Sequence, residues 1–215
     1  RSLEADICVL LDTRLNATAG EYHAAAIKYF LPGSAVSLHS TTRHSAKAAG
    51  GARIQTMGGA MYILAPRCAH RLAHSQADRS NLGVAGYITL RFPDATYHIS
   101  HGYVPPPASS TDGPATLNQR LKTYLAAHAS HISPQQYVLK QLTSWITAAR
   151  SRGAHIITGG DFNMDPTTSR GISLKQWAQD LALLNVFDPR TTDTAPKTHL
   201  LGGIPHSRID HIYAD

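Results

Sequence analysis

The stretch Gly159-Gly160-Asp161-Phe162-Asn163-Met164-Asp165-Pro166 follows a short apolar run, His155-Ile156-Ile157-Thr158, which is typical of a buried strand. Side chains alternate along a strand, so we expect Asp161 and Asn163 on one face, two residues apart. A carboxylate beside a carboxamide at the end of a strand has little structural purpose of its own. The plainer alternative is a turn in which Asp161 caps backbone N–H groups.

A second acid interrupts an apolar strand pattern near the C-terminus, in Ser207-Arg208-Ile209-Asp210-His211-Ile212. A charge buried in a strand needs a partner or a metal ion. Two acids in two separate strand patterns, Asp161 and Asp210, therefore predict a polar site rather than core.

Two further segments place a polar side chain after an apolar run. Ala5-Asp6-Ile7-Cys8-Val9-Leu10-Leu11-Asp12-Thr13-Arg14 carries Asp12, and His101-Gly102-Tyr103-Val104-Pro105 carries Tyr103. Taken alone, Asp12 fits a helix-side cap or a surface ion pair. Tyr103, likewise, fits an ordinary aromatic side chain at a strand's end.

Together and in this order, the four segments resemble the endonuclease/exonuclease/phosphatase superfamily, the group of the apurinic endonucleases, deoxyribonuclease I and the endonuclease domains of LINE-type retrotransposons. Gly-Asp-x-Asn after a strand, then Arg-x-Asp-x-Ile about fifty residues later, is that group's signature. The resemblance covers the chain from Ala5 to Tyr213. The C-terminal stretch, with Thr198 shortly before Ser207-Arg208-Ile209-Asp210, most resembles the retrotransposon branch of this superfamily.

The resemblance implies metal-dependent hydrolysis of phosphodiester bonds, with DNA nicking as the expected reaction. It assigns Asp12 to the metal ion, which we expect to be Mg²⁺, with Mn²⁺ as an alternative. Asp161 would orient or deprotonate the attacking water. Asn163 and Tyr103 would donate hydrogen bonds to the phosphate or leaving group. Asp210 belongs to the position that pairs, in the family, with a phosphate-contacting His.

The sequence also departs from the family pattern. Asp12 stands where a Glu is usual, only Arg1–Glu4 precede its segment, and the chain stops at Asp215. The family's first strand, which carries an Asn, and its last strand, which carries Ser-Asp-His, are thus missing. We therefore expect one domain over residues 1–215, partial at both ends. A fragment that keeps the fold, binds nucleic acid and cuts feebly or not at all is the alternative function.

The fold class implied is α/β, a four-layer α-β-β-α sandwich of two mixed sheets flanked by helices, lacking the family's first and last strands. Strands are expected at Leu3–Leu11, Ala35–His39, Gly59–Leu64, Val84–Phe92 and Ala95–Tyr103, the last two as an antiparallel pair. Helices are expected from the capping box Thr18-Ala19-Gly20-Glu21 to Phe30, over Leu117–Ala127, from Ser133-Pro134-Gln135-Gln136 to Gly153, and over Ser173–Leu184. The motif segments also hold His101, His199, His206 and His211, which we expect to be surface or loop residues.

The net charge of +6 favours a polyanionic partner such as DNA, although a merely soluble basic protein would also carry it. Residues 40–56 contain Arg43, Lys47 and Arg53 and no acid. We predict that these three cations contact DNA phosphates, and a solvated linker is the alternative. The basic balance argues against the superfamily's phosphatases of lipid or inositol phosphates, which remain a further alternative.

No apolar run approaches the eighteen residues or so of a membrane span, so no membrane partner is expected. The two cysteines, Cys8 and Cys68, form neither a zinc motif nor a disulfide framework, which favours a reducing, intracellular compartment. A retrotransposon origin would make the protein nuclear. It would also place the chain in a polyprotein, covalently linked to a reverse transcriptase.

Overall fold

The computed structural model describes residues 5–15, 17–39, 58–106, 116–165, 168–186, 199–201, 204–207 and 210–215. Arg43, Lys47 and Arg53, which were predicted to contact DNA, lie outside these ranges, as does Thr198. In the part of the chain that is described, no helix is long and apolar enough to cross a bilayer.

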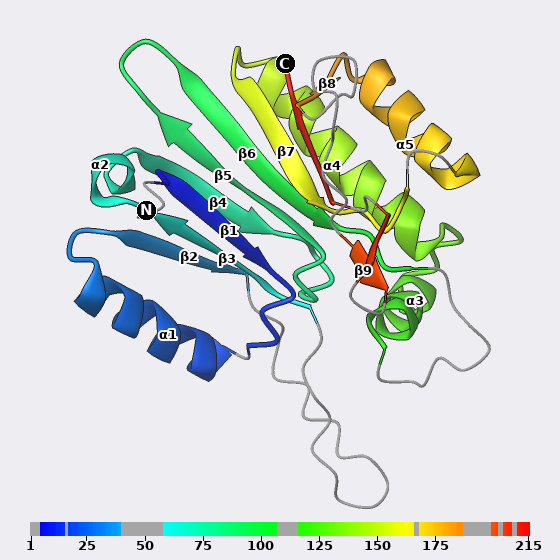
Figure 1. The fold of residues 1–215 in the computed structure, drawn as a ribbon, viewed down its shortest axis with the longest axis horizontal. Helices are drawn as coiled ribbons and strands as arrows, with labels where there is room; N and C mark the ends of the chain where they lie inside the picture. The colour runs from blue at the N-terminus through cyan, green and yellow to red at the C-terminus, as the bar shows by residue number, and fades with distance from the viewer. Residues whose placement is uncertain are drawn as a thin grey trace, which may run out of the picture.

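The strands form two main sheets (Figure 1). The smaller sheet has the order β1-β3-β2 and is antiparallel, with β1 at Ile7–Leu11, β2 at Ala35–His39 and β3 at Ala60–Leu64. The larger sheet has the order β4-β5-β6-β7-β11-β8, and its parallel pair is β6–β7. Its strands are β4 (Leu72–Ala77), β5 (Ala85–Arg91), β6 (Thr96–Tyr103), β7 (His155–Asp161), β8 (Leu184–Asn185) and β11 (Asp210–Ala214). A separate hairpin joins β9 (His199–Leu201) to β10 (Ile204–Ser207).

Helices cover the outer faces of both sheets (Figure 1). On the smaller sheet lies α1 (Ala17–Phe30), next to β2, and a short α2 (Pro66–Ala69) follows β3. The larger sheet carries α3 (Leu117–Ala127), α4 (Pro134–Arg150) and α5 (Ser169–Asp180). One core, which includes Tyr62 and Ile88, lies between the sheets, and the other, which includes Leu142 and Ile156, lies under these three helices. The four-layer α-β-β-α prediction is therefore confirmed.

Helix starts follow their local capping signals to different degrees. The Ser133 hydroxyl accepts the Gln136 backbone N–H at 3.1 Å, and the Gln136 side chain accepts that of Ser133 at 2.9 Å, so α4 begins with the predicted capping box. The bounds predicted for α5 are wrong, because the helix covers Ser169–Asp180 and not Ser173–Leu184, and the Thr168 hydroxyl caps it by accepting the Gly171 N–H at 3.2 Å. The predicted cap of α1 is also displaced, since the helix begins at Ala17 and encloses Thr18.

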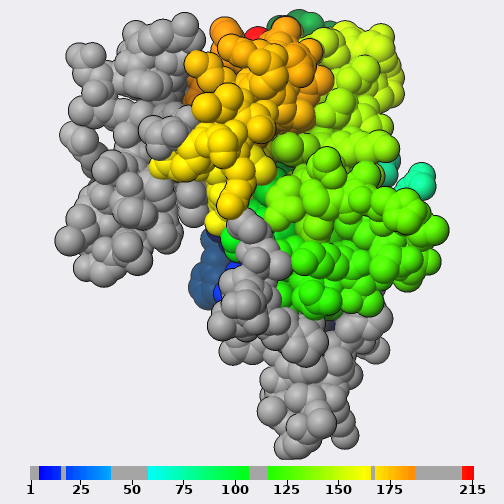
Figure 2. Space-filling model, turned by 90° about the vertical axis from the view of Figure 1, so that its right-hand side faces the viewer, coloured from blue at the N-terminus to red at the C-terminus, as the bar shows by residue number. Residues whose placement is uncertain are grey.

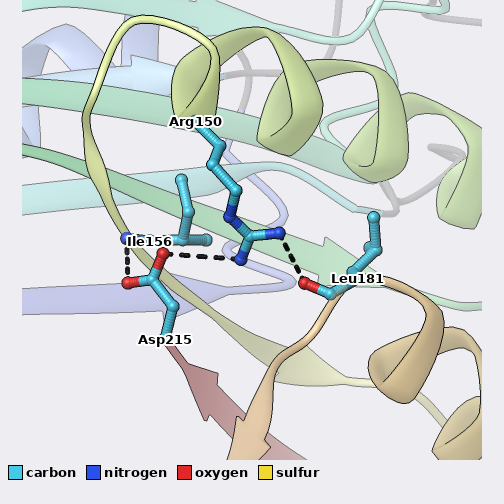
Figure 3. Close-up of polar contacts among 4 residues, drawn as sticks. All are labelled: Arg150, Ile156, Leu181 and Asp215. Carbon is cyan, nitrogen blue, oxygen red and sulfur yellow. Dashed lines mark hydrogen bonds and ion pairs between the residues drawn. The ribbon is translucent and has the colours of Figure 1, made fainter.

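At the end of the larger sheet away from Asp161, side chains tie β11 to the helices (Figure 3). Asp215 accepts the Ile156 backbone N–H at 2.8 Å and pairs with the Arg150 guanidinium at 3.4 Å. Arg150 also donates to the carbonyl of Leu181, at the C-terminus of α5, at 2.5 Å. These contacts join the end of β11 to β7 and α4, in the register that places Asp210 opposite Asp161.

Candidate active site

Three of the predicted site residues stand in one row across adjacent strands. In the parallel β6–β7 pair Tyr103 is opposite Asp161, and in the antiparallel β7–β11 pair Asp161 is opposite Asp210. Residues directly opposite one another share a face of the sheet. His101 lies on the same face of β6 as Tyr103 and contacts Tyr62 of the smaller sheet, so the row faces the smaller sheet.

Two glycines next to this row let β6 and β7 approach closely. Gly102 is opposite Gly160, and a Cβ added to Gly160 would lie 1.9 Å from the Gly102 carbonyl oxygen. Gly160 also has a φ of +151°, which side-chain-bearing residues rarely adopt. A side chain at Gly160 would push apart the strands that carry Tyr103 and Asp161.

The segment after β7 combines the two interpretations that its sequence left open. The Asn163 backbone N–H donates to Oδ1 of Asp161 at 3.0 Å, which is the capping contact of a turn. The same turn brings the Asn163 side chain to the end of β6, where its Nδ2 donates to the Val104 carbonyl at 2.9 Å. The turn therefore holds the carboxylate and the carboxamide in place beside Tyr103.

Asp12 comes to this site from the end of β1. Its Oδ1 accepts the Gly58 backbone N–H at 2.8 Å, and its Oδ2 accepts Nε of Arg14 at 3.0 Å. The contact with Arg14 is the surface ion pair that the sequence left open for Asp12 taken alone, although no role was predicted for Arg14 itself. Both residues adopt a positive φ, 47° and 53°.

The ionisation of Tyr103 links these residues electrostatically. Burial raises the pKa of Tyr103, and the negative charges of Asp161 and Asp12 raise it further. A hydrogen bond with Asn163 and the charge of Arg14 act in the opposite direction without cancelling the rise. Tyr103 therefore keeps its proton around neutral pH and can donate a hydrogen bond there. The structure thus brings together all five predicted residues: Asp12, Tyr103, Asp161, Asn163 and Asp210.

Backbone strain is concentrated in the same place. Of the six non-glycine residues with positive φ in the described ranges, three belong to this site, namely Asp12, Arg14 and Asn163. Such conformations cost about 1–3 kcal/mol each and persist where the surrounding contacts enforce them. Their clustering is typical of a functional site.

The donor set fits a magnesium ion held mainly by water and phosphate oxygens. Asp12 offers a hard carboxylate oxygen ligand, and Mg²⁺ commonly uses one or two carboxylates while retaining several waters. Among the described residues, no group of three or more His, Cys, Asp or Glu side chains is arranged to hold a metal ion. A cation at Asp12 would compete with Arg14 for Oδ2.

The expectation that the motif histidines lie at the surface is wrong for His101 and His211. His101 is buried between the sheets, with Nδ1 2.7 Å from the Tyr62 hydroxyl, and burial, together with the nearby His39, lowers its pKa to about 3. His211 is buried under the helices, with Nε2 2.9 Å from the Met164 carbonyl oxygen. The side chains of His199 and His206 lie outside the described residues.

Comparison with known proteins identifies the fold. No family model matches the sequence, and no curated protein matches it. Solved structures do match. The 3′ phosphatase NExo from Neisseria, bound to a product DNA hairpin, superposes with a TM-score of 0.61 at 15% identity, over 98% of this chain and 76% of that chain.

The endonuclease/exonuclease/phosphatase fold is the fold of this chain. An AP endonuclease from Archaeoglobus fulgidus has a TM-score of 0.58 at 12% identity, covering 97% of this chain and 76% of that chain. The human Nocturnin catalytic domain has a TM-score of 0.57 at 13% identity, covering 97% and 68%. These likenesses establish the architecture that the motif order predicted.

Proposed function

We propose that this chain is a metal-dependent phosphodiesterase that nicks DNA. The observation that carries the proposal is the row Tyr103–Asp161–Asp210 at the end of three adjacent strands, with Asn163 and Asp12 beside it. The row combines two carboxylates with a protonated phenol. A carboxylate can accept a proton from a water molecule while the phenol donates a hydrogen bond to a phosphate. Structural neighbours that are phosphatases and nucleases support hydrolysis of phosphate esters in general.

Each residue has a distinct task in the proposed reaction. Asp161, held by the Asn163 N–H, orients the attacking water and accepts its proton. Tyr103, kept protonated, donates a hydrogen bond to the phosphoryl or leaving oxygen. Asn163, fixed at Val104, offers its amide to the phosphate. Asp210 adds a second carboxylate to the row, opposite Asp161, at the position that pairs in the resembled family with a phosphate-contacting His.

Magnesium bound at Asp12 would supply Lewis-acid stabilisation of the phosphate charge. The ion would take the place of Arg14 at Oδ2 of Asp12, which Arg14 contacts at 3.0 Å. Mn²⁺ is expected to substitute, because it also accepts oxygen ligands.

The retrotransposon origin is part of the proposal and rests on the C-terminal motif around Ser207-Arg208-Ile209-Asp210. It implies DNA as the substrate, a nuclear location and a parent polyprotein with a reverse transcriptase. The basic stretch with Arg43, Lys47 and Arg53 is proposed to contact DNA phosphates.

A plasmid assay tests the function directly. The chain is incubated with supercoiled plasmid and Mg²⁺, and open-circular product is measured with and without EDTA. Asp161→Asn is expected to reduce nicking by at least about 100-fold, because it removes the proton acceptor. Asp94→Asn is the matched control, since Asp94 is exposed in the turn before β6 and the charge change is the same. Equal nicking by the two variants would contradict the proposal.

A second candidate is a chain that binds DNA but cuts it poorly. The observation that favours it is the Arg14–Asp12 contact, which a metal ion must displace. In that case DNA binding would be measurable while nicking stayed at the level of the EDTA control, for the unmodified chain and Asp161→Asn alike.

A further inference from the structure

Residues 82–84, in the loop between β4 and β5, connect the two halves of the candidate active site. The Leu82 carbonyl accepts the Gly59 backbone N–H at 3.0 Å, and the Val84 carbonyl accepts that of Tyr103 at 2.7 Å. Gly59 belongs to the turn before β3 of the smaller sheet, whereas Tyr103 ends β6 of the larger sheet. Three consecutive residues therefore link the smaller sheet to the row that contains Tyr103.

The turn before β3 is also the one that holds the candidate metal ligand. The Gly58 N–H donates to Oδ1 of Asp12 at 2.8 Å. The Gly58 carbonyl accepts the Arg14 N–H at 2.9 Å. The Gly59 carbonyl accepts the Thr13 N–H at 3.2 Å. Because three hydrogen bonds join Asp12 and the next two residues to this turn, a displacement of the turn moves the carboxylate as well.

Gly83 lies in direct contact with this turn. It has a φ of +64°, and a Cβ added there would lie 2.5 Å from Cα of Gly59 and 2.7 Å from the His39 carbonyl oxygen. Both neighbours are backbone atoms, so no rotation of a side chain relieves the contact. Real Cβ atoms essentially never approach closer than 3.0 Å, so a side chain at position 83 moves the turn and the loop apart by about 0.5 Å or more.

The loop is anchored on its own side, which directs the displacement to the turn. The side chains of Leu82 and Val84 are buried in the core under α3 (green), α4 (yellow-green) and α5 (yellow to orange), whose outer surface is shown in Figure 2. The Asp78 carboxylate is 1% exposed and accepts the Ser80 N–H at 2.9 Å and the Ala85 N–H at 3.4 Å. The Ser80 hydroxyl, which donates to Asp78, accepts the Leu82 N–H at 3.2 Å. The buried carboxylate thus has the donors it needs, and they order the loop around it.

We infer that residues 82–84 are a positioning element of the candidate active site, and that Gly83 sets the distance between the metal ligand Asp12 and Tyr103. These residues act through the backbone of Gly59 and Tyr103 and need no contact with substrate. The inference rests on the proposed function in taking Asp12 as the ligand of Mg²⁺.

The main test compares Gly83→Ala with Gly33→Ala in the full chain. Gly33 also has a positive φ, +80°, but a Cβ there would come no closer than 3.4 Å to its nearest neighbour, in Pro66. Gly33 precedes the end of β2 that is remote from Gly59, so the control carries the backbone strain without the contact at the turn.

A milder pair of variants adds no atoms. Ser80→Ala removes the acceptor of the Leu82 N–H, and Ser151→Ala makes the same change at an exposed residue directly after α4. This pair decides the question if Gly83→Ala does not fold.

The first measurement is amide hydrogen exchange by NMR, without metal or DNA. The Gly59 and Tyr103 amides donate to the two ends of the bridge, so both report on its opening. We expect them to exchange at least about tenfold faster in Gly83→Ala than in Gly33→Ala, and about fivefold faster in Ser80→Ala than in Ser151→Ala, as for the loss of one hydrogen bond.

The second measurement is the Mg²⁺ concentration that gives half-maximal nicking of supercoiled plasmid. A loss of stability alone would lower the rate at every Mg²⁺ concentration and leave the half-maximal concentration unchanged. Because a misplacement of about 1 Å costs about 100-fold, we expect a displacement of about half that size to raise the half-maximal concentration about tenfold in Gly83→Ala.

Equal exchange at Gly59 in Gly83→Ala and Gly33→Ala, or an equal half-maximal Mg²⁺ concentration, would overturn the inference. If the unmodified chain does not nick plasmid, the proposed function fails alone, and Mg²⁺ affinity from calorimetric titration replaces the nicking curve in the same comparison. An unmodified chain that binds no Mg²⁺ would overturn the inference as well.

Discussion

Gly160→Ala is the substitution whose effect the geometry predicts most directly. The added Cβ would lie 1.9 Å from the Gly102 carbonyl oxygen, whereas real Cβ atoms essentially never approach closer than 3.0 Å. The strands must therefore separate by about 1.1 Å at the row before Tyr103 and Asp161. Ladder hydrogen bonds of ordinary length would stretch to about 4 Å there and break.

The cost has two parts. Two weakened ladder bonds contribute about 1–3 kcal/mol, and the unfavourable φ contributes about 1–3 kcal/mol more. We expect a loss of about 3–5 kcal/mol in the free energy of unfolding, a large share of the 5–15 kcal/mol typical of a domain. A displacement of about 1 Å in the row should also reduce nicking by about 100-fold under conditions where the variant remains folded.

Urea denaturation followed by circular dichroism measures the stability change. Gly153→Ala is the matched control, because Gly153 also has a positive φ, +73°, but nothing lies within 4 Å of an added Cβ. It should lose only the strain of a left-handed residue, about 1–2 kcal/mol. If Gly160→Ala is no more than about 1 kcal/mol less stable than Gly153→Ala, a side chain at position 160 does not force β6 and β7 apart.

Local signals in the sequence predicted the elements that depend on few residues. The start of α4 is an example, because Ser133 and Gln136 satisfy each other's backbone groups without help from elsewhere. β4 was missed, because this edge strand is mostly exposed and its sequence, Leu-Ala-His-Ser-Gln-Ala, lacks an apolar alternation. The start of α5 was predicted four residues too late, because the cap at Thr168 was not recognised in the sequence.

The candidate site was predictable as a set of residues but not as an arrangement. The motif order placed Asp12, Tyr103, Asp161, Asn163 and Asp210 together, and alternation along the strands explains why the row faces one way. The contacts between segments that are far apart in the sequence could not be predicted from the motifs. Gly58 meets Asp12 across a long stretch of chain, and residues 82–84 meet Gly59 and Tyr103 only once the two sheets have formed and packed.

Three further variants test the surroundings of the site. Arg14→Ala should tighten Mg²⁺ binding about two- to fivefold in calorimetric titration, because a surface ion pair contributes on the order of 0–1 kcal/mol to holding Asp12; weaker binding would show that Arg14 supports the ion. Arg150→Met should lower the free energy of unfolding by about 1–2 kcal/mol by leaving the Leu181 carbonyl without its donor, and an unchanged urea midpoint would contradict this. His98 is buried, its ring nitrogens have no hydrogen-bond partner among the described residues, and burial lowers its pKa to about 4. The unfolded chain, with a histidine pKa of about 6.5, therefore binds the extra proton first as the pH falls, so stability is present above about pH 6.5 and is lost progressively towards pH 4. His98→Phe should be more stable at pH 7 by about 1–2 kcal/mol, since it removes two unsatisfied polar atoms. Between about pH 4 and pH 6.5 it should also reduce the slope of the unfolding free energy against pH, by up to about 1.4 kcal/mol per pH unit. Urea titrations at several pH values measure both quantities, and a variant that is less stable at pH 7 with an unchanged slope would mean that His98 is charged or hydrogen-bonded in the folded protein.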